Sequence, residues 1–267
     1  MENRKVILIT GAASGIGLLI ADKLHMDGYK VFGTSRFPDK YKDKVPFELL
    51  PLDITSEESI QHCVDILFTK VAGLDVLINN AGAFLGGSVE ETTIEQAYKQ
   101  FEINFWGAVK MTKAILPIMR KQRAGKIITT GSLTGLIGLP LGCYYAATKH
   151  ALEGFFKSLR LEVKSFNIKV SVIEPAFFKT NIDSASEYAA ETIADYDEIR
   201  KRAIDFVKSS VAGALTPEPV ADTVLRIIKS ENPKYSYPIG KNSKFLPALH
   251  FLSPGMFEAG FLKKLKI

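Results

Sequence analysis

The chain alternates short apolar runs with longer segments in which apolar residues recur every three or four positions. The short runs predict buried strands at residues 6–9, 30–34, 47–52, 74–78, 126–130, 169–173 and 235–239. The longer segments predict helices at 16–26, 57–71, 94–122, 144–166 and 219–229, and a charged, largely helical surface segment at 181–208. Pro238 in the last run assigns that strand to an edge of the sheet.

Nearly continuous apolar strands separated by helices are typical of a parallel sheet that is covered on both faces. No repeat, linker or low-complexity segment interrupts this alternation. We therefore predict an α/β fold, a single doubly wound Rossmann-type domain over residues 1–267 with a parallel sheet of about seven strands.

A glycine-rich turn, TGAASGIG at residues 10–17, joins the first predicted strand to the first helix. Glycines let the backbone approach a pyrophosphate, whose charge the free N–H groups of the helix N-terminus stabilise. The spacing is GxxxGxG rather than the GxGxxG usual in dinucleotide folds, and a purely structural turn is the alternative. The cofactor-binding residues predicted here are Gly11, Ser14, Gly15, Ile16 and Gly17.

The end of the second predicted strand indicates which nicotinamide cofactor is preferred. An acidic residue there would bind the ribose 2′-hydroxyl of NAD, but this chain has Ser35 and Arg36. A guanidinium offers charge-assisted hydrogen bonds to a 2′-phosphate, so we expect NADP(H) to be favoured over NAD(H). The alternative is a solvated loop arginine.

Candidate acid–base residues follow the fifth predicted strand. Ser132 lies just beyond that strand, and Tyr145 and Lys149 lie four residues apart on the next helix, on one face. An adjacent ammonium favours the phenolate, so Lys149 is expected to lower the pKa of Tyr145. Tyr144 is the rival tyrosine, but its partner four residues on is Thr148, which carries no charge.

The glycine turn, Asn79-Asn80-Ala81-Gly82, Asn104, Ser132 and the Tyr145/Lys149 pair together resemble the classical short-chain dehydrogenase/reductase family. The resemblance runs from about residue 4 to 240. Residues 132–140 and 151–154 look most like the 17β-hydroxysteroid and retinol dehydrogenase branch.

The resemblance implies a role for each catalytic candidate. Tyr145 would be the general acid in carbonyl reduction or the base in alcohol oxidation, and Lys149 would tune it and hold the nicotinamide ribose. Ser132 would hydrogen-bond the substrate oxygen, and Asn104 would anchor a water of a proton relay. Additional cofactor-binding residues implied are Asp53, which would bind the adenine amine, and Ile54, Asn80, Ala81, Gly82, Phe178 and Thr180. The chain departs from the family at Ala176, where a glycine is usual.

Composition excludes several other classes. With 46% hydrophobic and 24% charged residues, the chain has the composition of a soluble globular protein. A net charge of +5 suits an anionic cofactor and is far from that of a nucleic-acid-binding tail. The two cysteines and four histidines show no metal-ligand spacing, so we predict no metal and no disulfide framework. No apolar run is long enough to span a membrane, and we expect a cytoplasmic protein.

Residues 177–215 occupy the position of the segment that covers the substrate in this family. An apolar pocket is predicted there and beside Tyr145, lined by Phe177, Phe178, Ile182, Tyr188, Tyr196, Leu133, Leu139, Leu141 and Cys143. Such a pocket suits a lipophilic ketone or secondary alcohol, steroid-, retinoid- or aromatic-like. The alternative is that these side chains only pack the covering segment.

The C-terminal tail, residues 241–267, carries Phe257, Phe261 and Leu265 on one helical stripe, together with lysines. Peripheral contact with a membrane surface is one interpretation, and packing over the pocket or on a partner subunit is the other. The family resemblance implies a homodimer or homotetramer formed through the helices at 94–122 and 144–166.

The prediction is thus an NADP(H)-dependent oxidoreductase that transfers a hydride between the nicotinamide and a lipophilic ketone or secondary alcohol. The enzyme alternatives are a 3-oxoacyl thioester reductase and a sugar or polyol dehydrogenase. A catalytically silent NADPH-sensing regulator is the alternative from another class. The complete set of Asn104, Ser132, Tyr145 and Lys149 argues against it, because a sensor needs no tuned proton donor.

Overall fold

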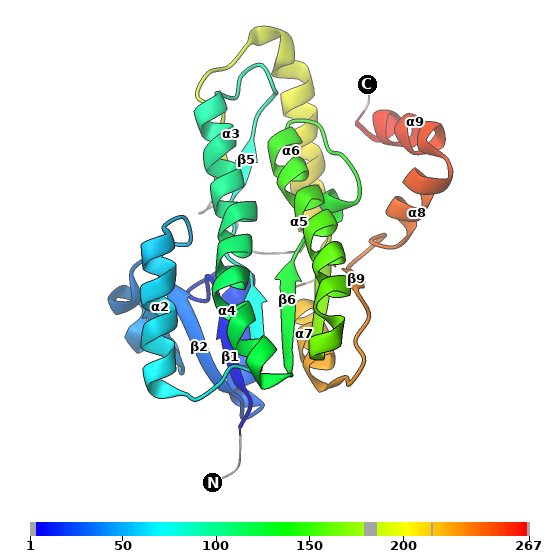
Figure 1. Ribbon diagram of the computed structural model, residues 1–267. Helices are drawn as coiled ribbons and strands as arrows, with labels where there is room; N and C mark the ends of the chain where they lie inside the picture. The colour runs from blue at the N-terminus through cyan, green and yellow to red at the C-terminus, as the bar shows by residue number, and fades with distance from the viewer. Residues whose placement is uncertain (1–3, 179–185, 215, 266–267) are drawn as a thin grey trace.

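The computed structural model describes residues 4–178, 186–214 and 216–265. Its main sheet, in this part of the chain, has seven strands that all pair in parallel (Figure 1). In spatial order these are β3 (Glu48–Pro51), β2 (Lys30–Ser35), β1 (Val6–Ile9), β4 (Val76–Asn79), β6 (Gly125–Thr130), β7 (Ile168–Pro175) and β9 (Ser236–Ile239). The doubly wound α/β prediction is confirmed, and the proline-containing strand β9 lies at an edge as expected.

Helices cover both faces of the sheet because side chains along each strand alternate between them. On β1, Ile7 and Ile9 pack with α1 (Gly15–Met26) and α7 (Glu218–Lys229), whereas Leu8 points to the opposite face. That opposite face is covered by α2 (Glu57–Lys70), α4 (Gly107–Gln122) and α5 (Cys143–Glu162). Their buried side chains include Leu67, Met111 and Phe156. The catalytic candidates therefore lie on elements fixed by a continuous core.

The helix predicted at 94–122 is interrupted. It consists of α3 (Ile94–Phe101), a π-helical turn at Glu102–Trp106, and then α4. Thr93 and Gln96 begin α3 with reciprocal hydrogen bonds between side chain and backbone. A π-helical turn adds one residue within an otherwise continuous helix, and the chain is helical on both sides of it, so the sequence pattern predicts a single uninterrupted helix. Asn104 lies at the centre of this turn.

The prediction of helix at 181–208 is wrong for residues 186–193. Residues 179–185 lie outside the described part of the chain, and β8 (Ser186–Tyr188) then pairs in parallel with β5 (Phe84–Gly86). The helix α6 (Asp197–Ala212) begins only after a short 3₁₀ turn at Ala194–Tyr196. We call residues 186–212 the cover. The predicted helix at 144–166 is α5 followed by a 3₁₀ turn at Lys164–Phe166.

The C-terminal tail forms two helices, α8 (Phe245–Leu252) and α9 (Pro254–Leu265), which lie to one side of the molecule beyond β9 (Figure 1). Phe257 is buried in a small cluster with Leu133 and Ile137, against which Phe261 packs. The predicted stripe thus faces the body of the protein. Among the described helices, none has the length and apolar character required to cross a membrane.

Candidate active site

The glycine turn at the carboxyl end of β1 is packed tightly against the end of β4. Gly11 and Gly15 have φ angles of +68° and +58°, a region that favours glycine. A Cβ on Gly17 would lie 2.3 Å from the Gly11 carbonyl oxygen and 2.4 Å from Nδ2 of Asn80. The first residue of the turn, Thr10, accepts hydrogen bonds at Oγ1 from the backbone N–H groups of Asn80 and Ala81, at 2.9 and 3.0 Å. The sequence-predicted residues are therefore brought together in one cradle.

The N-terminus of α1 opens from this cradle. Ser14 is the N-cap residue but makes no side-chain cap hydrogen bond, and the first turn carries no acidic residue. The first backbone N–H groups of a helix have no partner within the helix, and the helix dipole favours an anion near them. The cradle at Gly11–Gly17 consequently fits the pyrophosphate of a dinucleotide, with Ser14, Gly15 and Ile16 beside it.

Arg36 and Asp53 lie at the carboxyl ends of β2 and β3, where the adenosine half of a dinucleotide is expected. Both residues are exposed. Hydrogen bonds from the backbone N–H and hydroxyl of Thr55 chiefly lower the pKa of Asp53, and the charge of Arg36 adds to this effect. Ser35 accepts a hydrogen bond from the Phe37 N–H, and Ile54 packs against Gly107.

A cluster of hydroxyl groups lies between the end of β6 and the start of α5. Ser132 is the N-cap of a 3₁₀ turn, and its Oγ accepts a hydrogen bond from Oγ1 of Thr134 at 2.9 Å. Both hydroxyls lie close enough to the phenol of Tyr145 to act on its pKa. The ring of Phe84 packs edge-on against Tyr145, with 5.1 Å between the ring centroids. Ser132 and Tyr145 thus present two hydroxyls to one small volume.

Lys149 is buried, and its ammonium group donates a hydrogen bond to the Thr130 carbonyl oxygen at 2.8 Å. Its Nζ lies 5.7 Å from the centroid of the Tyr145 ring. Burial lowers the pKa of Lys149 to about 8, against the opposing effect of the Glu153 carboxylate.

The expected lowering of the Tyr145 pKa by Lys149 is wrong for this structure. Burial raises the pKa of Tyr145, and the Ser132 and Thr134 hydroxyls oppose that rise. The spacing correctly placed both side chains on one face of α5, but the degree of burial depends on the surrounding fold.

Asn104 is buried and links three elements. Its Oδ1 accepts a hydrogen bond from the Ala83 N–H at 2.8 Å, and its Nδ2 donates to the Ala83 carbonyl oxygen and to Oγ1 of Thr148. A Cβ on Gly82 would lie 3.3 Å from Oδ1 of Asn104. The π-helical turn therefore aims Asn104 at the segment after β4 and at the residue preceding Lys149.

Two further carboxyl groups, Glu153 on α5 and Glu174 on β7, interact with this end of the sheet. Glu153 lies one helical turn beyond Lys149 and accepts a hydrogen bond from the Tyr235 hydroxyl at 3.0 Å. Glu174 is fully buried. Burial raises the pKa of Glu174 to about 8, and the nearby charge of Glu153 adds to the rise. Glu174 is consequently largely protonated at neutral pH.

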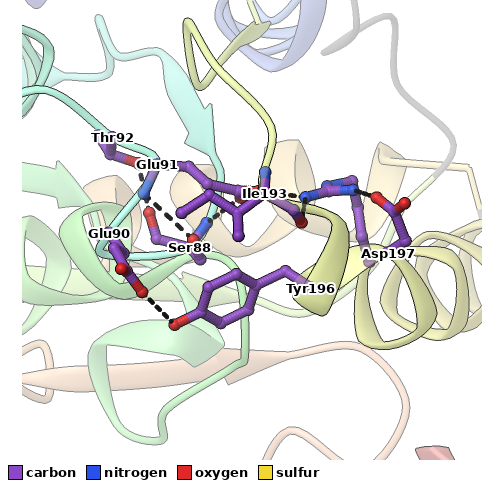
Figure 2. Close-up of polar contacts among 8 residues, drawn as sticks. Ser88, Glu90, Glu91, Thr92, Ile193, Tyr196 and Asp197 are labelled. Carbon is purple, nitrogen blue, oxygen red and sulfur yellow. Dashed lines mark hydrogen bonds and ion pairs between the residues drawn. The ribbon is translucent and has the colours of Figure 1, made fainter.

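The cover is fastened to the segment that precedes α3 (Figure 2). The buried carboxylate of Glu91 accepts hydrogen bonds from the backbone N–H groups of Ile193 and Ser88 and forms an ion pair with Arg200. The Ile193 N–H chiefly lowers the pKa of Glu91, and Arg200 adds to this effect. Arg200 also pairs with Asp197. A second contact lies nearby, where the Tyr196 hydroxyl donates a hydrogen bond to the Glu90 carboxylate at 3.0 Å.

Aromatic side chains continue from the end of β7 into the tail. The rings of Phe177, Phe206 and Phe261 pack edge to face in sequence, with centroid distances of 5.8 and 5.5 Å. Phe178 is buried in the core beside Gly240. Tyr188 is 60% exposed and Cys143 is exposed, so neither is enclosed in the described structure. Thr180 and Ile182 lie outside the described residues.

Sequence reasoning missed several polar partners of the site. Thr134 donates a hydrogen bond to Ser132 and opposes the rise in the Tyr145 pKa. The Thr130 carbonyl oxygen accepts a hydrogen bond from Lys149, and Oγ1 of Thr148 accepts one from Asn104. Thr134 lies two residues after Ser132, the spacing of a local hydroxyl–backbone turn, which is a signal that could have been used. The Thr130 contact involves a backbone carbonyl and leaves no signal in the residue type.

Comparisons with known proteins agree with this arrangement. The family model for short chain dehydrogenases matches residues 5–190. A 3-ketodihydrosphingosine reductase of Bacteroides thetaiotaomicron is 36% identical over 239 residues, which are 88% of this chain and 88% of that protein. The solved structure of a short-chain dehydrogenase from Streptomyces avermitilis is similar with a TM-score of 0.84 and 29% identity, covering 100% of this chain and 98% of that one.

A further solved structure, ElxO with NADP bound, has a TM-score of 0.70 and 28% identity and covers 88% of this chain and 96% of its own. The family model covers most of the chain, and the Bacteroides relative extends over nearly all of it. This chain therefore belongs to the short-chain dehydrogenase/reductase family, whose oxidoreductases use nicotinamide cofactors.

Proposed function

We propose that the protein is an NADP(H)-dependent oxidoreductase acting on a lipophilic ketone or secondary alcohol. The observation that carries this proposal is the convergence of the Ser132 and Tyr145 hydroxyls beside the buried ammonium of Lys149, at the edge of the sheet that holds the glycine cradle. Two hydroxyls at one point suit a carbonyl or alcohol oxygen, which can accept two hydrogen bonds.

In the reducing direction, Ser132 and Tyr145 bind the carbonyl oxygen and orient the carbonyl carbon. The bound nicotinamide supplies the hydride to that carbon. Tyr145 donates its phenolic proton to the oxygen, so that the ketone becomes a secondary alcohol and Tyr145 becomes a phenolate. The hydroxyls of Ser132 and Thr134, which oppose the rise in the Tyr145 pKa, support this phenolate. Lys149, whose Nζ lies 5.7 Å from the centroid of the Tyr145 ring, holds the nicotinamide ribose. Asn104 holds the segment after β4 and the start of the Thr148–Lys149 turn in place.

The preference for NADP(H) rests on Arg36. This residue is exposed at the end of β2, where the family's NAD-binding members would need an acid and this chain has none. The charge of Arg36 acts on Asp53, which indicates that both side chains face the same region. The similar solved structure of ElxO contains NADP, which is consistent with this preference.

A lipophilic substrate is supported by the apolar surroundings of the site. Phe84 contacts Tyr145, Leu133 and Ile137 follow Ser132, and the aromatic chain from Phe177 continues under the tail. Apolar surroundings of this kind favour apolar molecules with few polar groups. The relative from Bacteroides thetaiotaomicron is named for the reduction of a ketone carried by a sphingoid lipid. The likeness to the hydroxysteroid and retinol dehydrogenase branch points in the same direction.

The test is NADPH oxidation by the purified protein with a panel of steroid, retinoid, aromatic, long-chain, 3-oxoacyl thioester and keto-sugar carbonyls. We expect turnover of the apolar members, and its loss in Tyr145→Phe with NADPH binding retained. Tyr144→Phe is the matched control and should keep full activity, because its side chain has no charged partner four residues on.

Other results would change the proposal. Turnover of thioesters or keto-sugars alone would replace the lipophilic substrate. NADPH binding without any turnover would favour a regulator that senses the cofactor. Full activity in Tyr145→Phe would refute the proton-donor role.

A further inference from the structure

The two C-terminal helices carry large apolar side chains that are exposed to solvent. Phe251 and Leu252, at the end of α8, are 84% and 79% exposed, and Phe245 and Met256 are 62% and 63% exposed. Monomeric proteins rarely leave a large apolar patch exposed without a partner. We call these four residues the apolar ridge.

The ridge is distinct from the stripe that the sequence singled out. Phe257 is buried and Phe261 packs beside it, and both turn toward Leu133 and Ile137 in the body of the protein. The helix pair is therefore held by one face and exposes the other. Because the inner face satisfies the packing of α9, the exposed ridge is not needed to attach these helices to the fold.

Lysines flank the ridge along the chain. Lys241 and Lys244 precede α8, and Lys263 and Lys264 lie in the last turn of α9, all four exposed. Glu258 is the only acidic residue between positions 241 and 265. An apolar ridge bordered by lysines matches the interface of an anionic membrane, where apolar groups enter the headgroup region and lysines meet the lipid phosphates.

We propose that the apolar ridge of α8 and α9 docks the protein onto an anionic lipid surface. A second copy of the chain is a poorer occupant. In a two-fold contact through the ridge, the four lysines of one copy would come close to the four lysines of the other. Each copy has only one glutamate in this segment to offset them, and repulsion between like charges disfavours such an interface. The opposite charge of an anionic bilayer removes this conflict.

Docking at this position would bring the substrate side of the protein close to the bilayer. The inner face of α9 packs on Leu133, the residue after Ser132, and on the aromatic chain that reaches Phe177. A lipophilic substrate could then pass from the bilayer to the site without crossing bulk water. This consequence rests on the proposed function, whereas the docking itself does not.

The experiment is sedimentation of the full chain with vesicles of phosphatidylcholine alone and of phosphatidylcholine mixed with phosphatidylglycerol. We expect binding to the anionic vesicles only, weakening as salt is added. The variant Phe251→Gln/Leu252→Gln should bind about tenfold more weakly or worse. The matched control is Met26→Gln/Leu161→Gln, which alters side chains 83% and 74% exposed elsewhere and should bind like the parent.

NADPH binding should be unchanged in both variants, which shows that they are folded and separates this test from that of the proposed function. The proposal is overturned if the parent ignores anionic vesicles, or if the Phe251/Leu252 variant binds them as well as the parent does. It is also overturned if sedimentation velocity shows that this variant loses self-association while vesicle binding persists, because the ridge would then be a contact between copies.

Discussion

Gly17 offers a sharp test of the cofactor cradle. Adding one methyl group in Gly17→Ala would place it 2.3 Å from the Gly11 carbonyl oxygen and 2.4 Å from Nδ2 of Asn80. The oxygen belongs to the backbone and cannot rotate away. The Asn80 amide is held by hydrogen bonds to the carbonyl oxygens of Thr10 and Gly11, at 3.0 and 3.2 Å. The turn must therefore open or lose these bonds.

The size of the effect follows from the terms involved. Overpacking of a rigid site costs about 1–3 kcal/mol, and each lost hydrogen bond about 1 kcal/mol. The helix preference of alanine over glycine returns about 1 kcal/mol. We expect a net loss of roughly 1–3 kcal/mol in the free energy of unfolding, which lowers Tm by about 2–10 °C in a chain of this size. An opened cradle should also raise the Kd for NADPH by about 10- to 100-fold.

The assay is thermal unfolding together with NADPH titration followed by fluorescence. Gly154→Ala is the matched control, because Gly154 lies within α5 and nothing lies within 4 Å of a Cβ built there. That variant should match the parent in Kd and be as stable or up to about 1 kcal/mol more stable. If Gly17→Ala behaves like Gly154→Ala in both measurements, the argument from close packing is refuted.

Three further predictions concern charged groups. Arg36→Glu should raise the Kd for NADPH by about 10- to 100-fold and change the Kd for NADH little, as titration of both cofactors would show. An equal loss of affinity for both cofactors would contradict the role of Arg36 in binding the 2′-phosphate. Glu174 ionises at its ordinary value of 4.5 when unfolded but at about 8 when folded, so the folded chain binds more protons and stability falls as pH rises between these values. In Glu174→Gln the decline of Tm from pH 5 to pH 8 should therefore be smaller, and parallel curves for variant and parent would exclude the shift. Arg200→Gln should loosen the cover and raise KM for the substrate several-fold, with NADPH affinity unchanged. Arg202→Gln removes an exposed ion pair of the same helix and should leave KM unchanged. Equal KM values for the two variants would show that the ion pair of Arg200 with Glu91 is dispensable.

Much of the fold could be predicted because its elements are marked by local pattern. Each strand of the main sheet is an apolar run, and turn residues separate it from the next helix. The pairing of β5 with β8 could not be predicted in this way. These strands have three residues each, lie about a hundred residues apart and form only when the cover meets the loop before α3.

In the site, too, local spacing predicts some features, whereas others depend on contacts distant in the sequence. The positions of Tyr145 and Lys149 on one face follow from helical spacing alone, and the structure bears this out. The direction of the Tyr145 pKa shift does not follow from spacing, because it depends on burial by the surrounding fold and on the Ser132 and Thr134 hydroxyls from another element. Likewise, Phe257 and Phe261 were predicted as a stripe, but which side of the helix meets the protein is decided by Leu133 and Ile137, far away in the sequence.

The way in which the cover is fastened has a consequence for redesigning the enzyme's selectivity. Its polar attachments run mainly to residues 84–99. There β5 pairs with β8, Glu91 forms an ion pair with Arg200, Gln96 donates a hydrogen bond to the Tyr188 carbonyl oxygen, and Lys99 forms an ion pair with Glu187. A cover transplanted from a relative would lose these attachments unless that stretch were exchanged with it. Grafting residues 186–212 alone should therefore give a chimera in which the cover is not attached to the rest of the protein. Residues 84–99 and 186–212 should be exchanged together.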